Sequence, residues 1–193
     1  VVFSDSEFHG KTVVITGGGG SIGAAIAEAF ASKSANVILV GKTATSLDRV
    51  CDRLAESYPT QIIQSYVCDV TKRESIPTII EFLNAQKLSI DVAVLSAGTQ
   101  LRIPALQIKP DELNDILNVN FVGAANCAIE FGRLMRKRGN PGRVVFITSL
   151  TAEIGIRNIS AYGAAKGAVQ AFSKALAVEW AGDGITVNCV GPG

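Results

Sequence analysis

The stretch Thr12-Val-Val-Ile-Thr-Gly-Gly-Gly-Gly-Ser-Ile-Gly23 and the following Ala24-Ala-Ile-Ala-Glu-Ala-Phe30 decide the fold. The first five residues are mostly β-branched and predict a buried strand, whereas the alanine-rich run predicts a helix. A glycine turn between the two lets the backbone approach a pyrophosphate, and the helix start offers free N–H groups to it. The spacing Gly18-x-Gly20-x-x-Gly23 satisfies the dinucleotide fingerprint. Four adjacent glycines could also form a plain flexible loop, but the strand before and the helix after favour nucleotide binding.

The rest of the chain repeats this alternation of short apolar runs and helical patterns. Strands are predicted over residues 12–16, 36–40, 62–68, 91–96, 143–148 and 186–190, and helices over 21–34, 46–58, 75–86, 111–138 and 159–181. Strands that are apolar at nearly every position are buried on both faces, which is typical of a parallel sheet covered by helices. We therefore expect a single α/β domain, a Rossmann-type doubly wound parallel sheet flanked by helices, with its ligand at the carboxyl ends of the strands.

The composition excludes several classes of function. The 193 residues are 48% hydrophobic and 18% charged, with a net charge of +1 and no basic block, so neither nucleic acid nor a membrane is expected as a partner. A single histidine, His9, leaves little scope for a Ser–His triad, and we expect no metal site. The four cysteines are scattered without a CxxC pair and predict reduced thiols in a cytoplasmic protein.

The end of the second predicted strand bears on cofactor choice. An acidic residue about 20 residues past the glycines would bond the ribose 2′-hydroxyl of NAD(H). Here Gly41 stands in that place and Lys42 follows, and a cation without a carboxylate favours the 2′-phosphate of NADP(H). Lys42 could equally be a solvated lysine in a turn. NADP(H) is thus the favoured cofactor, with NAD(H) possible.

Three side chains near the fifth strand have the chemistry of a proton-transfer site. Ser149 ends that strand, and Tyr162 and Lys166 follow with i, i+4 spacing on one predicted helix face. A phenol titrates near 10, so we expect the neighbouring ammonium to lower the pKa of Tyr162 enough for acid–base work. The alternative is an amphipathic helix whose tyrosine and lysine side chains only extend to the surface and carry no chemistry.

Taken together, these motifs resemble those of the short-chain dehydrogenases/reductases. The similar segments, in family order, are Thr16–Gly23 for TGxxxGxG, Asp69-Val70 for the adenine contact, Leu95-Ser-Ala-Gly98 for NNAG, Asn118-Val-Asn120, the trio Ser149, Tyr162 and Lys166, and Val187–Gly193 for VNxxxPG. Two positions depart from the pattern. Ser21 replaces a glycine of the turn, and Leu95-Ser96 replaces both asparagines of NNAG.

The resemblance implies a role for each of these residues. Tyr162 would be the general acid/base, Ser149 would stabilise the substrate oxygen, Lys166 would hold the nicotinamide ribose, and Asn120 would hold a relay water. The implied cofactor-binding residues are Gly17, Gly19, Gly20, Ser21, Ile22, Gly23, Lys42, Asp69, Val70, Ser96, Ala97, Gly98, Tyr162, Lys166, Pro192 and Gly193. Since family members continue past this point, we expect the domain over residues 1–193 to lack the usual lid and last strand.

The expected activity is the interconversion of a carbonyl and an alcohol with a nicotinamide cofactor. A 3-oxoacyl thioester and a sugar, polyol or other small ketone remain open as substrates; Gln100, Arg102, Glu153 and Arg157 lean towards a hydrophilic or anionic one. The family also implies a homo-oligomer, a tetramer or dimer, formed through the helices over 111–138 and 159–181. The alternative is a non-catalytic nucleotide sensor or scaffold that kept the fold.

Overall fold

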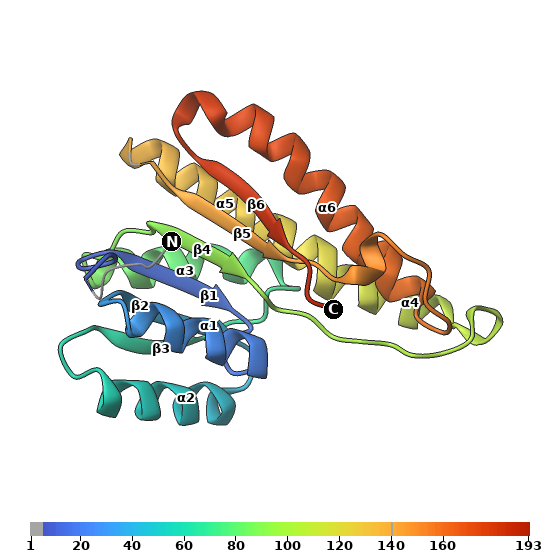
Figure 1. The fold of residues 1–193 in the computed structure, drawn as a ribbon, viewed down its shortest axis with the longest axis horizontal. Helices are drawn as coiled ribbons and strands as arrows, with labels where there is room; N and C mark the ends of the chain where they lie inside the picture. The colour runs from blue at the N-terminus through green and yellow to red at the C-terminus, as the bar shows by residue number, and fades with distance from the viewer. Residues whose placement is uncertain (1–5, 140) are drawn as a thin grey trace.

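Six strands form one parallel sheet in the computed structural model, which describes residues 6–139 and 141–193. They are β1 (Thr12–Thr16), β2 (Asn36–Gly41), β3 (Ile63–Val67), β4 (Val92–Leu95), β5 (Arg143–Ile147) and β6 (Thr186–Val190). Their order is β3-β2-β1-β4-β5-β6, so the winding reverses between β1 and β4 (Figure 1). The doubly wound Rossmann-type sheet is thereby confirmed, and its switch point places the binding crevice beside the glycine turn.

The helices connect consecutive strands and cover the sheet. They are α1 (Ser21–Ala31), α2 (Ala44–Ser57), α3 (Ile76–Ala85), α4 (Pro110–Leu117), α5 (Gly123–Arg138) and α6 (Ser160–Trp180). Short 3-10 turns lie at Arg73–Ser75, Ala105–Gln107, Leu150–Ala152 and Ala181–Asp183, and a π-helical turn, Asn118–Val122, joins α4 to α5. The predicted helix over 111–138 is therefore one continuous helical segment that begins one residue earlier and contains an unpredicted π turn.

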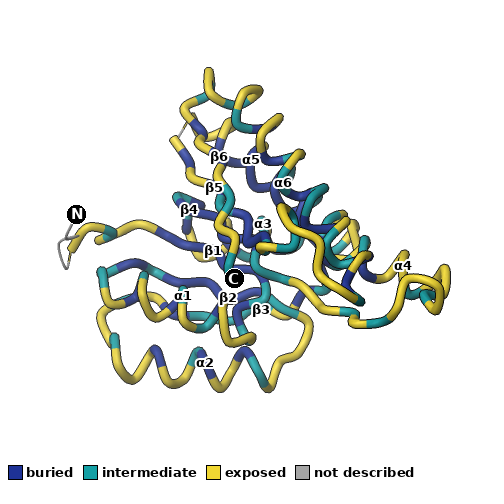
Figure 2. The backbone as a smooth tube through the Cα atoms, turned by 45° about the vertical axis from the view of Figure 1, so that its right-hand side comes forward, coloured by how far each residue is buried: buried dark blue, intermediate teal, exposed yellow. Residues whose placement is uncertain are grey.

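Two apolar layers hold the helices to the sheet. Successive residues of β1 point to opposite faces, as a period of two requires: Val13 and Ile15 pack with α1 and α2, whereas Val14 packs with α3, α5 and α6. The central strands are accordingly buried along their length (Figure 2). Burial on both faces explains why these strands are apolar at almost every position.

The predicted boundaries differ from the observed ones by at most three residues. The strand predicted over 62–68 is shorter at both ends, and α1 stops at Ala31, where the chain turns through Ser34 with a positive φ of 68°. Strands β1 and β6 match their predicted limits. Hydrogen bonding between neighbours sets strand ends, and that information is absent from local pattern.

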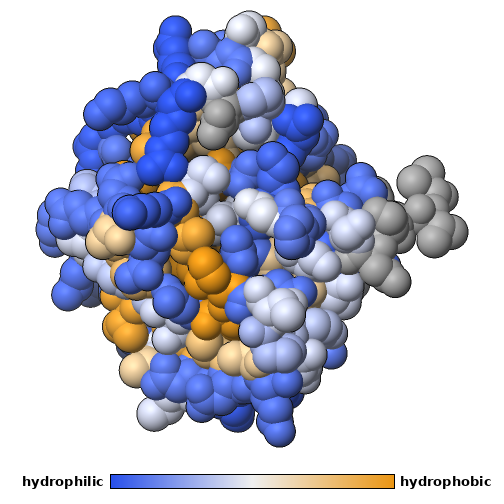
Figure 3. Space-filling model, turned by 90° about the vertical axis from the view of Figure 1, so that its left-hand side faces the viewer, coloured by the Kyte–Doolittle hydropathy of each residue, from blue (hydrophilic) through white to orange (hydrophobic). Residues whose placement is uncertain are grey.

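The surface carries apolar residues outside the crevice as well. Seen from the side where the strands begin, hydrophobic atoms gather in the middle of the face with hydrophilic ones around them (Figure 3). Large exposed apolar side chains include Leu106, Val178 and Val67, the last on the edge strand β3. Some of these positions are therefore suited to further contacts.

Candidate active site

The glycine turn between β1 and α1 is built so that only glycine fits at two positions. Gly17 has a φ of +70°, and a Cβ on it would lie 2.8 Å from the backbone of Ala97. A Cβ on Gly23 would lie 2.4 Å from the carbonyl oxygen of Gly17, inside contact distance. The start of α1 therefore rests directly against the turn. The amides of its first three residues have no acceptor within the helix and are available to an anionic group.

A cleft of about 980 Å³ opens at the carboxyl ends of the strands beside this turn. Most of the predicted cofactor-binding residues line it: Gly17, Gly19, Gly20, Ser21, Ile22, Gly23, Lys42, Asp69, Val70, Ser96, Ala97 and Gly98. Sequence reasoning missed Thr43, Ser46 and Thr71, whose hydroxyl-bearing side chains join Lys42 in the lining. Thr43 follows Lys42 directly and Ser46 lies in the first turn of α2, so their closeness to Lys42 in the chain was the sequence feature that could have predicted their place in the cleft.

The end of the cleft near β2 contains the Lys42 ammonium group and the Asp69 carboxylate, and the carboxylate is hydrogen-bonded to Thr71. Asp69 accepts hydrogen bonds from the Thr71 amide (3.0 Å) and hydroxyl (2.8 Å), and these bonds lower its pKa, with a smaller contribution from Lys42. Within the described residues Lys42 has no salt-bridge partner. Its ammonium group is therefore free to meet a negative group of a ligand.

The altered NNAG segment still joins β4 to β1. The Ser96 hydroxyl donates to the Thr16 carbonyl oxygen at 2.6 Å, and the Ala97 amide donates to the Thr16 hydroxyl at 3.3 Å. Serine thus supplies a bond across the switch point where the family pattern has asparagine. The residue that links β4 to β1 therefore differs from the family pattern, but the hydrogen bonds between the two strands are present.

The buried Asn120 side chain links Thr99 in the cleft lining to Ile116 in α4 through hydrogen bonds. It is 1% exposed, and its amide donates to the carbonyl oxygens of Thr99 (2.9 Å) and Ile116 (3.0 Å) while its Oδ1 accepts from the Thr99 amide (3.3 Å). A Cβ on Gly98 would lie 2.7 Å from this Oδ1 and 3.7 Å from the Lys166 ammonium nitrogen. The π turn thus brings Asn120, Gly98 and Lys166 into one small volume.

Ser149, Tyr162 and Lys166 meet beside the cleft, where the Lys166 ammonium group lies close to Gly98 of the lining. None of the three lines the cleft itself, although Tyr162 and Lys166 are predicted cofactor-binding residues, and Asn120 does not line it either. The Ser149 hydroxyl oxygen accepts a hydrogen bond from the Thr151 amide (3.2 Å), while Lys166 donates to the Ile147 carbonyl oxygen (2.8 Å). The Lys166 nitrogen lies 5.6 Å from the centre of the Tyr162 ring. The predicted trio is brought together, with Ser149 supplied by the end of β5 and the other two by one face of α6.

Burial dominates the electrostatics of this trio. It raises the pKa of Tyr162, which hydrogen bonding with Ser149 opposes, and it lowers the pKa of Lys166 from 10.5 to about 8, which Cys189 opposes. The prediction that Lys166 lowers the pKa of Tyr162 was therefore wrong for the protein chain by itself. The reason is that both groups lose water on folding and that the ammonium is turned towards the Ile147 carbonyl.

Pro192 and Gly193, also predicted to bind the cofactor, are not among the residues that line the cleft. The Leu150 amide donates to the Pro192 carbonyl oxygen at 3.0 Å, which holds the end of the chain against the turn after Ser149. In residues 6–139 and 141–193, no cluster of three or more acidic, histidine or cysteine side chains could hold a metal ion. Among the helices described, none has the length and hydropathy that a bilayer span requires.

The comparison with known protein families agrees with this geometry. The family model described as short chain dehydrogenase matches residues 11–193. The chain belongs to the short-chain dehydrogenase family. Within that family, it is 32% identical over 187 residues to the 3-oxoacyl-(acyl-carrier-protein) reductase FabG of Escherichia coli (strain K12), a match that covers 97% of this chain and 74% of that protein.

Two solved structures show how closely the fold agrees with other short-chain dehydrogenases. The L-sorbose reductase from Gluconobacter frateurii, complexed with NADPH and L-sorbose, superposes with a TM-score of 0.91 at 29% identity, covering 98% of this chain and 72% of that one. NAD+-bound xylitol dehydrogenase gives a TM-score of 0.92 at 31% identity, covering 97% and 71%. The predictions of the family and of a nicotinamide-dependent oxidoreductase acting on CH–OH or C=O groups are confirmed.

The residues of the cleft themselves fit a nicotinamide dinucleotide. The glycine turn is a cradle that Cβ atoms would fill, free helix amides lie at its side, and Ser149, Tyr162 and Lys166 lie beside the cleft. The glycine turn and the free amides together suit a pyrophosphate, and the three side chains would lie near the nicotinamide end of such a ligand.

Proposed function

We propose that this short-chain dehydrogenase is an NADP(H)-dependent enzyme that interconverts a carbonyl and an alcohol on a small molecule, with Tyr162 as general acid/base. The observation that carries the proposal is the meeting of Ser149, Tyr162 and Lys166 beside the cleft that fits a dinucleotide. A raised pKa keeps the Tyr162 phenol protonated at neutral pH, as a proton donor to a carbonyl oxygen must be. Bound nicotinamide would supply or accept the hydride.

The other two members of the trio would prepare Tyr162 for this work. The Thr151 amide orients the Ser149 hydroxyl group, which hydrogen-bonds Tyr162 and would donate to the substrate oxygen, where negative charge develops. Lys166, held by Ile147, would bind the nicotinamide ribose hydroxyls. Asn120 would position Lys166 and a relay water through its bonds to Thr99 and Ile116.

The choice of NADP(H) rests on the end of the cleft near β2. Lys42 lines it with Thr43 and Ser46, giving one cation and two hydroxyl groups, and Gly41 stands where an acidic side chain would repel a phosphate. A 2′-phosphate is the group that such a donor set binds best. Similar proteins use both cofactors, since the sorbose reductase holds NADPH and the xylitol dehydrogenase holds NAD+.

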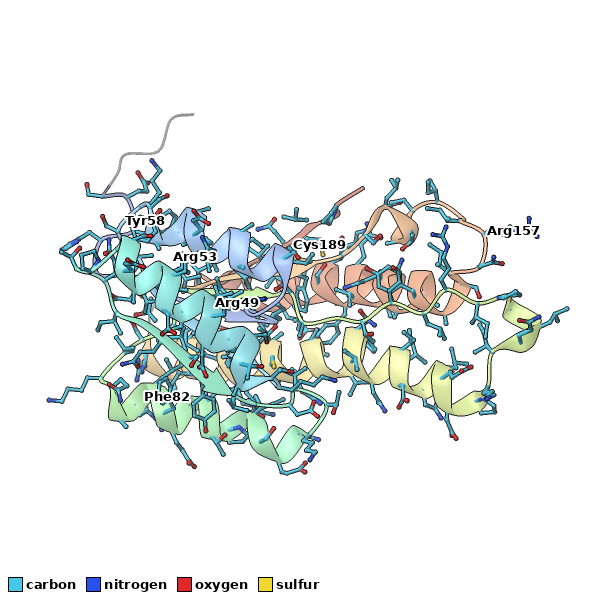
Figure 4. All side chains as sticks on the ribbon, turned by 90° about the horizontal axis from the view of Figure 1, so that it is seen from below. Arg49, Arg53, Tyr58, Phe82, Arg157 and Cys189 are labelled. Carbon is cyan, nitrogen blue, oxygen red and sulfur yellow. The ribbon has the colours of Figure 1, made fainter. Side chains whose placement is uncertain are left out.

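The substrate class is proposed as a 3-oxoacyl thioester or a sugar, polyol or other small ketone, in line with the substrates for which the relatives are named. The expectation of a hydrophilic or anionic substrate, which was based on four polar loop residues, is weakened for two of them. Arg157 projects from the tip of its loop, away from the helices (Figure 4), and Glu153 is hydrogen-bonded to Gln170 on α6. The wall of the cleft does contain Gln100, which suits a hydroxylated substrate.

We further propose a homo-oligomer that associates through α5 and α6. Val178 on α6 is 80% exposed, although it is apolar and lies on a long, regular helix. A shallow groove between the two helices contains Trp180 and Ile129. Light scattering coupled to size exclusion would test this, and a monomer at micromolar concentration would refute it.

The cytoplasmic location stays a proposal supported by the cysteines. All four are free thiols, and Cys68 and Cys127 are buried with raised pKa values because burial disfavours the thiolate. Such thiols stay reduced and inert in a cytoplasmic environment.

The activity is tested by following NADPH oxidation over a panel of ketones, sugars and 3-oxoacyl thioesters. Wild type should turn over at least one class, and Tyr162→Phe should lose about 10²–10⁴-fold in kcat while it binds NADPH normally. NADPH binding without turnover on any compound would refute the enzyme and favour a nucleotide sensor. For cofactor choice, Lys42→Ala should weaken NADPH binding and leave NADH binding unchanged; an unaltered ratio of the two affinities would refute that assignment.

A further inference from the structure

Among the described residues, three other than glycine adopt a left-handed backbone conformation: Ser34, Lys87 and Asn158, with φ of 68°, 58° and 67°. Ser34 lies three residues after the end of α1 and Lys87 two residues after the end of α3, and the amides after them donate to carbonyl groups of the last helical turn. This arrangement ends helices commonly and accounts for both. Asn158 ends no helix, because it stands two residues before α6 begins. Its conformation calls for a different explanation.

The carbonyl group of Asn158 is hydrogen-bonded to the segment 100–107, whose first two residues line the cleft. Its oxygen accepts the Ile103 amide at 2.7 Å. The chain after β4 and the loop before α6 therefore lie side by side at one end of the molecule (Figure 1). In the described part of the chain, no other hydrogen bond ties residues 100–107 to a different element. This stretch includes Gln100 and Leu101 of the cleft lining and is mostly exposed.

On its other side, Asn158 leads directly into the helix that carries the acid–base residues. The next residue, Ile159, is 5% exposed, and its carbonyl oxygen accepts the Gly163 amide at 2.9 Å, which begins the first turn of α6. Tyr162 lies within that turn. One backbone unit thus contacts the substrate-side wall and precedes the proton donor by four residues.

We propose that Asn158 is a positioning residue that clamps the wall segment 100–107 to the start of α6 and so sets the distance between bound substrate and Tyr162. This rests on the function proposed above. The left-handed conformation is what points the Asn158 carbonyl at Ile103, and asparagine is among the few residues other than glycine that adopt it readily. A β-branched residue at this position would favour an extended backbone and release the wall.

Asn158→Val tests the clamp, with Asn158→Gly as the conservative variant and Lys87→Val as the matched control. Lys87→Val puts the same side chain into the same backbone conformation at the end of α3, outside the residues that line the cleft. Left-handed geometry disfavours valine by about a factor of ten, so kcat/KM of Asn158→Val for the ketone should fall about tenfold, mostly through KM. NADPH affinity should stay within about twofold in all three variants, and Asn158→Gly should keep near-normal kcat/KM.

Amide hydrogen exchange gives a second readout that needs no activity. The Ile103 amide should exchange about tenfold faster in Asn158→Val than in wild type or Lys87→Val, because its acceptor is displaced. If Asn158→Val does not fold, Asn158→Ala carries the same comparison with a smaller loss. Equal kcat/KM in Asn158→Val and Lys87→Val, or unchanged exchange at Ile103, would overturn the proposal. Absence of any ketone reduction in wild type would refute the proposed function, while the exchange data would still decide the clamp.

Discussion

Replacing Lys166 with methionine should stabilise the folded chain while it removes the activity. Lys166 is 4% exposed, and within the described residues its ammonium group is held by the hydrogen bond to the Ile147 carbonyl. Burial of a charged ammonium opposes folding, whereas methionine has a similar length and no charge. Lys166, which is proposed to hold a ribose, is therefore expected to weaken the fold that contains it.

The size of the effect follows from the pKa of Lys166. The value falls from 10.5 to about 8, and at about 1.4 kcal/mol per pKa unit this shift destabilises the charged form in the folded state by roughly 3 kcal/mol. Methionine also loses the hydrogen bond to Ile147, which costs about 1 kcal/mol. At pH 7 the variant should therefore gain about 2 kcal/mol of unfolding free energy, or roughly 4–8 °C in Tm.

The gain should depend on pH with a definite sign. Between about pH 8 and pH 10.5 the unfolded chain keeps a proton on Lys166 that the folded chain has released. Wild-type stability therefore rises with pH across this window relative to the variant. By pH 10.5 the advantage of Lys166→Met should have disappeared, leaving wild type more stable by about 1 kcal/mol.

Urea unfolding at pH 7 and at pH 10.5 measures both quantities. Lys174→Met is the matched control, because Lys174 lies on the exposed side of the same helix and the substitution makes the same change of side chain outside the buried site. Turnover of a ketone by NADPH should be lost in Lys166→Met alone. A variant less stable than wild type at pH 7, or a stability difference that does not change with pH, would refute the reasoning from burial.

Three further predictions concern the cleft and its proton donor. Ser96→Ala removes the 2.6 Å bond to the Thr16 carbonyl and should cost about 1 kcal/mol in urea unfolding; no loss would mean that the bond adds nothing to β4 pairing. Gly23→Ala puts a Cβ 2.4 Å from the Gly17 oxygen and should abolish NADPH binding. Calorimetry would measure this, and normal binding would contradict a rigid turn. Since the pKa of Tyr162 is raised and that of Lys166 is about 8, ketone reduction should stay constant from pH 6 to 7, and a fall within that range would contradict a protonated phenol as the donor.

The local pattern was sufficient for the sheet and for most of the cofactor cleft. Each strand is short, apolar and followed by a turn, so the amino-acid sequence alone places the carboxyl ends that carry Gly17, Lys42, Asp69 and Ser96 at one edge. What the pattern could not supply was the reach of α2 into the cleft. Thr43 and Ser46 line it because of how the helix starts after β2, which is a matter of packing.

The i, i+4 spacing of Tyr162 and Lys166 correctly placed them on one helix face, but it carried no information on their hydration. Their pKa values depend on burial against β5 and on the Ile147 carbonyl, both of which are long-range contacts. Asn120 shows the same limit. Its place in the motif was visible, but its bonds to Thr99 and Ile116 and the π turn that delivers it were not.

The π turn Asn118–Val122 means that the segment from α4 to α5 holds one residue more than a regular helix of the same length. Ile116 before the turn and Ala124 after it are 3% and 5% exposed, so the helices on both sides of the turn, α4 and α5, each bury one particular face. Each residue of an α-helix rotates the chain by about 100°. Shortening the turn by one position would wind it into an ordinary helix and swing one half around its axis, expelling either Ile116 or Ala124 into water. Evolution can therefore exchange side chains within this turn far more easily than it can change its length.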